Sequence, residues 1–211
     1  MEKLAKLFGS IHRVKIMRLF LFNQEEVFVL EDIVKRTKVK KEFVNKEIKL
    51  LEGIGFIKKK TFTGEHQVKS RKKGVKYETK KKKMVGLYLN TSFEFVLPLQ
   101  TLLVDSELVK EKDIVKEISS AGTVKLLALS GVFTRDEDRA LDILIVGDKL
   151  NKSAAERALK TLESEIGREL RYAIFDTDEF EYRISMYDKL IRDIFDYKHI
   201  KLIDKITINI D

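Results

Sequence analysis

Apolar positions in the first part of the chain recur every three or four residues, which is the spacing of helices. In the segment 10–23 they fall on one face, and Ser10 can cap the start of that helix. The same spacing predicts a brief second helix over 30–37. After a tight turn it predicts a third helix over 40–52, which ends at Gly53.

After Phe56 the pattern changes from helical spacing to alternation. The segments FIKKKTFTG and VKYETKKKKMVGLYL alternate well enough for strands, with a connecting loop from Gly64 to Gly74. Upstream, Val27 and Phe28 suit either a short strand or the entry to the next helix. The first part of the chain therefore predicts three helices followed by a two-stranded ribbon.

The second half alternates helices with strands. The expected elements are a helix over 113–120, strands over 124–129 and 141–146, a helix over 154–166, a strand over 170–175, and a long last helix through 179–195 capped by Asp176 or Thr177. This order indicates an α/β layer rather than a helical bundle. The fold class expected for the whole chain is α+β or α/β, with a helical and ribbon domain followed by an α/β domain.

Between the halves lies the segment 91–112, which contains the only proline, Pro98. Its many apolar residues argue against a flexible linker. We expect this segment to dock on a domain or to contribute to a dimer contact. The expected domains are therefore residues 1–90 and residues 113–211.

Charge separates the two halves more sharply than the net value of +8 suggests. Residues 1–84 carry 24 Lys and Arg against 10 Asp and Glu, a net +14, whereas residues 85–211 carry 18 against 24, a net −6. Twelve of the cations lie between Phe56 and Met84, against two glutamates. Such a concentration favours a polyanionic partner for the first half, and double-stranded DNA would release counterions on binding it.

Composition excludes several other classes of site. The chain has no cysteine, so it has no disulfide and no thiolate metal site, and its three histidines lack the spacing of zinc ligands. No apolar run approaches the roughly 20 residues that span a bilayer, and the first residues lack the apolar centre of a secretory signal. We therefore expect a cytoplasmic protein that does not insert in a membrane.

The residues IVKRTKVKKEFVNKEIKLLEGIGFIKKK carry a family resemblance. Their order of helix, tight turn, helix and ribbon resembles a winged helix-turn-helix domain over about residues 8–90. The resemblance implies that a recognition helix, about 40–52, enters the major groove and that a basic wing, about 56–84, follows the DNA backbone.

Asn45 is the residue best suited to read a base, because its amide can pair bidentately with adenine. The lysines of the expected recognition helix would reach guanine or phosphate, and the wing cations would contact phosphate. Besides Asn45, the expected DNA-binding residues are Lys40, Lys41, Lys46, Lys49, Lys69, Arg71, Lys72, Lys73 and Lys76.

The stretch SGVFTRDEDRALDILIVGD carries a second resemblance. A glycine after an apolar strand, a loop, and a second apolar strand with an acid resemble the DNA polymerase β-like nucleotidyltransferase fold, over about residues 113–196. That family implies a Gly-Ser pair and three carboxylates that hold two metal ions. Here Val132 follows Gly131, Ala140 stands at the first acidic position, and only Asp142 matches.

Because LRYAIF offers no third carboxylate, we expect a degenerate domain in which Gly131 and Asp142 are remnants, with no catalytic residues, no metal site and no cofactor. The chain as a whole resembles a transcriptional regulator, with double-stranded DNA as its partner. Its second domain would form a homodimer or sense a nucleotide effector.

Two alternatives remain open at this point. The first is a Mg²⁺-dependent nucleotidyltransferase whose basic half holds a nucleic acid. The second is RNA or non-specific DNA binding by the wing alone.

Overall fold

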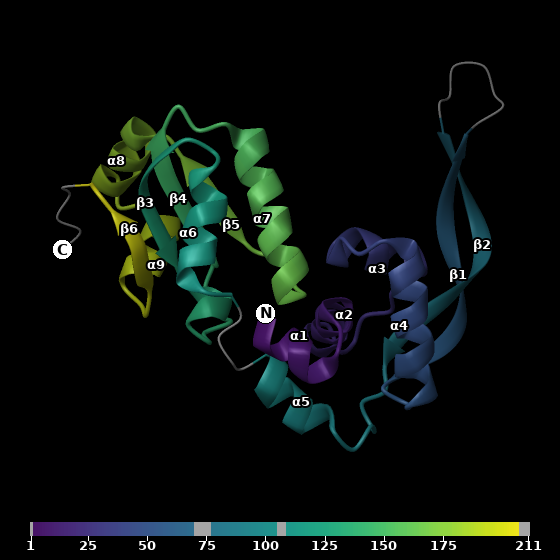
Figure 1. Ribbon diagram of the computed structural model, residues 1–211. Helices are drawn as coiled ribbons and strands as arrows, with labels where there is room; N and C mark the ends of the chain where they lie inside the picture. Colours follow the sequence, from purple (N-terminus) through teal and green to yellow (C-terminus); the bar gives the residue numbers. More distant parts are fainter. Residues whose placement is uncertain (1, 70–76, 105–108, 207–211) are drawn as a thin grey trace. The chain divides into compact units, whose positions relative to one another are not determined.

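The computed structural model describes residues 2–69, 77–104 and 109–206 (Figure 1). The chain is a mixed α and β protein with two small sheets, as expected. It divides into two compact units, which we call the N-terminal unit (residues 2–100) and the C-terminal unit (residues 101–211). The division falls inside the expected connecting segment 91–112, part of which forms the helix α5 (Val96–Leu103).

The N-terminal unit consists of four helices and one two-stranded sheet before α5. In chain order these are α1 (Glu2–Phe8), α2 (Ile11–Phe22), α3 (Leu30–Thr37), α4 (Lys41–Gly53), β1 (Ile57–Lys69) and β2 (Tyr77–Leu89). The predicted cap of α2 is confirmed, since Ser10 Oγ accepts a hydrogen bond from the backbone N–H of Arg13 at 3.2 Å. The helices pack around a core that includes Val14, Ile33 and Val44, each fully buried.

The ribbon of β1 and β2 is antiparallel and extends past the helices of its unit (Figure 1). Phe28 forms an isolated bridge with Leu87, which favours the strand-like of the two interpretations of Val27 and Phe28. The expected loop from Gly64 is wrong in its first half, because β1 continues to Lys69. A Cβ at Gly64 would lie 2.7 Å from Met84 Sδ, so this glycine makes room for the methionine across the ribbon instead of turning the chain.

The C-terminal unit is a four-stranded sheet with helices on both faces (Figure 1). Its elements are α6 (Glu111–Ser119), β3 (Thr123–Leu129), the 3₁₀ turn η1 (Gly131–Phe133), β4 (Ile143–Asp148), α7 (Lys152–Ile166), β5 (Tyr172–Phe175), α8 (Thr177–Ser185), α9 (Lys189–Phe195) and β6 (Ile200–Asp204). The strand order is β5-β4-β3-β6, with β4 and β5 parallel and the other pairs antiparallel. One face packs Leu126, Leu144 and Val146 against Phe180 and Ile191.

The single long last helix predicted for residues 179–195 is wrong. The structure has α8 and α9, separated at Tyr187, which has φ +55° in the left-handed region. Asp188 then starts α9, because its Oδ1 accepts a hydrogen bond from the backbone N–H of Leu190 at 2.8 Å. The strand β6, which pairs with β3, was not predicted.

Candidate nucleic-acid interface

The helix α4 has one buried and one exposed face. Val44, Glu47, Ile48 and Leu51 are buried, and the opposite side is exposed to solvent. Of the predicted DNA-binding residues, the exposed ones on or just before α4 are Lys40, Lys41, Asn45, Lys46 and Lys49. Their spacing places Asn45, Lys46 and Lys49 on adjacent turns of one face.

A partly buried ion pair holds α4 against α2. Glu47 is only 4% exposed, and its Oε2 accepts a hydrogen bond from Arg13 Nε at 2.8 Å. Arg13 also donates from Nη1 to the carbonyl oxygen of Phe8 at 2.7 Å. Nearby, the rings of His12 and Phe43 lie 4.6 Å apart. These contacts fix the rotation of α4 about its axis, and with it the direction of Asn45.

The C-terminal end of α4 is tied to the ribbon. The backbone N–H of Phe56 donates to the carbonyl of Leu51 at 2.9 Å, and Asn90 Nδ2 donates to the carbonyl of Gly55 at 2.8 Å. Glu52 of α4 and Lys59 of β1 form an ion pair. These contacts fix the separation between the end of α4 and the ribbon.

A groove of about 530 Å³ lies between α4 and the ribbon. Asn45 and Lys49 line one side of it, and Lys59 and Val85 line the other. Its opening exposes an amide that can pair with bases beside cations that can contact phosphate.

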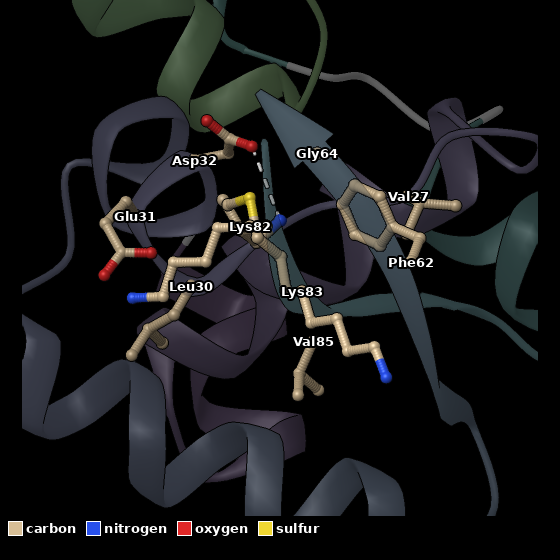
Figure 2. Close-up of a pocket in the computed structure, with 11 residues that line it drawn as sticks. Val27, Leu30, Glu31, Asp32, Phe62, Gly64, Lys82, Lys83 and Val85 are labelled. Atoms are coloured by element: carbon tan, nitrogen blue, oxygen red, sulfur yellow. Dashed lines mark hydrogen bonds between the residues drawn. The ribbon is translucent and has the colours of Figure 1, made fainter. Parts of the chain in front are cut away.

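A second groove, of about 750 Å³, lies between the start of α3 and the ribbon (Figure 2). Its charged lining consists of Glu31 and Asp32 on α3 and Lys82 and Lys83 on β2. Figure 2 shows the two lysine side chains extending from β2 in opposite directions, as neighbours on a strand do. Leu30 and Val85 line both grooves, so the two grooves are adjacent.

The ribbon presents exposed cations on both of its faces. By register, Lys58, Lys60 and Lys82 share one face, and Lys59 and Lys83 share the other. These lysines belong to the basic wing expected over about 56–84, although the DNA-binding residues expected by name did not include them. Lys69 is the last residue of β1, and Arg71, Lys72, Lys73 and Lys76 lie outside the described residues.

In the C-terminal unit, Asp142 is fully buried and all its hydrogen bonds are internal to that unit. Its Oδ1 accepts from the backbone N–H of Val132 at 2.9 Å and from Arg171 Nη2 at 3.1 Å. Its Oδ2 accepts from the backbone N–H of Arg171 at 2.8 Å and from Arg171 Nε at 3.2 Å. The hydrogen bond to Asp142 raises the pKa of the Arg171 guanidinium.

Gly131 is required by the same contact. It has φ +52°, and a Cβ there would lie 2.1 Å from Asp142 Oδ1. Gly131 and Asp142 therefore act together to hold the turn η1 against the start of β5. Arg171 belongs to the segment LRYAIF, so the side chain that this segment brings to Asp142 is a cation.

The acids of the loop before β4 also serve ion pairs. Arg139 Nε pairs with Asp136 at 2.9 Å and its Nη1 with Asp193 at 3.2 Å, while its guanidinium stacks 3.6 Å from the ring centre of Tyr197. Glu137 pairs with Arg168 at 2.9 Å. In the part of the chain that the structure describes, no group of three or more His, Asp or Glu side chains could hold a metal ion.

Comparison of the chain with models of protein families, with curated proteins and with solved structures gives no match. Among the described residues, no helix is long and apolar enough to cross a membrane.

Proposed function

We propose that the protein is a DNA-binding transcriptional regulator whose N-terminal unit is a winged helix-turn-helix domain. The observation that carries this proposal is the exposed face of α4, where Asn45, Lys46 and Lys49 lie together beside a lysine-rich ribbon. A helix of this kind fits the major groove of B-DNA, which is about 12 Å wide. Asn45 would pair with adenine, and the lysines would contact guanine or phosphate.

In this proposal the ribbon is the wing, and the C-terminal unit is a non-catalytic domain with a nucleotidyltransferase-like fold. The order of β3, a glycine turn, β4, α7 and β5 supports the second assignment. The four internal hydrogen bonds of Asp142 support a structural role for this acid. The unit would dimerise the protein or sense a nucleotide, and a dimer would let two recognition helices read a two-fold site.

The experiment that tests this function is fluorescence-anisotropy titration of duplex DNA. Genomic fragments from upstream of the protein's own gene would be compared with scrambled competitors at several salt concentrations. Asn45→Ala removes the amide on the exposed face of α4. Lys112→Ala, which removes an exposed lysine of the C-terminal unit, is the control variant.

We expect one fragment to survive competition with the wild-type protein and with Lys112→Ala, and to lose its advantage with Asn45→Ala. The loss should be about fivefold or more, because one good side-chain-to-base pair contributes about 1–3 kcal/mol of discrimination. Equal binding of all sequences would replace the proposal with non-specific binding by the ribbon, and no binding at all would refute it.

A further inference from the structure

The helix α4 carries three glutamates, and they have different surroundings. Glu47 pairs with Arg13 at 2.8 Å, and Glu52 pairs with Lys59. Glu42 is exposed, and its side chain has no ion-pair partner among the residues that the structure describes. Glu42 is thus the one acid of α4 whose carboxylate is free to meet a ligand.

Glu42 lies on the proposed DNA-binding face, near the N-terminal end of α4. Counting from Glu42, Asn45 is three positions away, Lys46 four and Lys49 seven, so the four side chains share one face of α4. Glu42 is also in the first turn of the helix. In helix-turn-helix complexes the N-terminal residues of the recognition helix are the ones that contact base edges.

A carboxylate at this place opposes binding to phosphate, because it adds a negative charge to a surface that would face a polyanion. DNA offers one kind of group in the major groove that a carboxylate matches, namely a hydrogen-bond donor. Cytosine presents its N4 amine there, and Glu or Asp can accept from it. Adenine presents a donor beside an acceptor, which suits an amide such as Asn45 better.

We propose that Glu42 is a specificity-determining residue that reads cytosine within one or two base pairs of the adenine contacted by Asn45. This inference rests on the proposed function, since it requires that α4 enter the major groove. The short distance follows from the geometry: three helical residues rise about 4.5 Å, whereas one base-pair step rises about 3.4 Å. The negative charge of Glu42 would also repel a DNA phosphate group at that point of the surface.

Glu42 has a second effect that must be separated from base reading. An acid in the first turn of a helix interacts favourably with the helix dipole, so its loss lowers stability whatever it contacts. Base preference distinguishes the two roles, because a weaker helix start changes the amount of folded protein and not the sequence that it selects.

The test is selection of binding sites from a randomised duplex DNA library by the wild-type protein, by Glu42→Gln and by Glu25→Gln. Glutamine matches the shape of glutamate, and its amide pairs with adenine. Glu25 is exposed and precedes α3, so its variant removes the same charge from the same unit without changing α4. Thermal unfolding of each variant reports any loss of stability.

We expect wild type and Glu25→Gln to select the same site, with cytosine at one position. Glu42→Gln should select adenine there, with cytosine disfavoured by about fivefold and the other positions unchanged. An unchanged site for Glu42→Gln would overturn the role of Glu42 and leave the proposed function intact. If the wild-type protein selects no sequence, the proposed function itself fails.

Discussion

Among single residues, Asp142 has the most demanding surroundings in the C-terminal unit. Its carboxylate is fully buried and accepts four hydrogen bonds, three of them from Arg171. Arg171 is 29 positions away in the chain, so no local pattern connects the two. The sequence shows a lone acid before an apolar strand, but only the fold brings it to the guanidinium.

Asp142→Asn should destabilise the C-terminal unit. An amide would turn N–H donors toward the donors of Arg171, and it would leave that cation without its charged partner. We expect the free energy of unfolding to fall by about 2–3 kcal/mol. This loss is smaller than for a fully buried ion pair, because Arg171 is partly exposed. Urea denaturation measures it, with exposed Asp138→Asn as the control.

An unchanged free energy of unfolding in Asp142→Asn would contradict the structural role of the acid. The same variant has a bearing on enzymatic assays. If a nucleotide-transfer activity disappeared in Asp142→Asn, the loss could follow from unfolding, so the stability of the variant must be measured first.

Gly131→Ala should also destabilise the unit, by about 2 kcal/mol or more. Alanine is strained at φ +52°, and its Cβ would collide with Asp142 Oδ1. Gly53→Ala is the matched control, because Gly53 ends α4 with ordinary φ and a Cβ added there would meet no neighbouring atom within 4 Å. The control should be neutral or more stable by up to about 1 kcal/mol. Equal effects of both substitutions in urea denaturation would refute the requirement for glycine at 131.

The two last helices show where periodicity misleads at the scale of elements. Ile184, Tyr187, Leu190 and Ile194 recur at helical spacing and predict one inward face. In the structure Ile194 is buried, but Tyr187 is 75% exposed and has φ +55°. The capping hydrogen bond that Leu190 N–H donates to the Asp188 carboxylate starts a new helix there, and spacing alone does not detect it.

Tyr187→Gly tests this break, because the change in the free energy of unfolding should have opposite signs in a broken and in a continuous helix. Glycine adopts the left-handed region without strain, so we expect the free energy of unfolding to rise by about 0.5–1 kcal/mol. In an unbroken helix the same change would lower it by about 1 kcal/mol. Tyr182→Gly, within α8 and 64% exposed, should show that loss. A loss in both variants would mean that the helix is continuous.

The contacts of Asp148, where β4 meets α8, predict that the stability of the C-terminal unit depends on pH. Asp148 accepts from Lys125 Nζ at 2.7 Å and from Thr177 Oγ1, and these hydrogen bonds lower the pKa of Asp148 below its ordinary value. A lowered folded pKa gives stability that is fully present above the unfolded pKa, near 4, and is lost as pH falls through the folded pKa.

Asp148→Asn should therefore be less stable than wild type at pH 7, and the difference should vanish in strong acid. Chemical denaturation between about pH 2 and pH 7 measures both curves. A difference that stays constant across this range would show that the carboxylate charge of Asp148 is not what binds β4 to α8.

Other elements were closer to expectation. The inward face of α4 follows from Val44, Ile48 and Leu51, and the structure buries all three. Glu47 joins them only because Arg13, 34 positions earlier, supplies a cation. The extent of β1 beyond Gly64 was missed for a similar reason, since the room that glycine gives to Met84 depends on the partner strand.

At the scale of the whole molecule, the division of charge and the division of structure coincide in broad terms. The basic residues 1–84 form most of the N-terminal unit, and the acidic residues 85–211 form the end of that unit and the C-terminal unit. Composition could therefore predict that the units differ, and periodicity could predict the exposed face of α4. The grooves beside the ribbon depend on tertiary packing and could not be read from the sequence.

The most direct test of the proposed interface is the salt dependence of duplex DNA binding by two triple variants. One removes Lys41, Lys46 and Lys49 from α4. The other removes Lys112, Lys152 and Lys189, which are exposed in the C-terminal unit. Each replaces three lysines by alanine, so the net charge changes equally.

If α4 lies on DNA, the slope of log K against log salt should become shallower by about two to three for the α4 variant and stay unchanged for the other. Equal changes in both variants would contradict the interface, because they would mean that DNA responds to the total charge of the protein and not to α4.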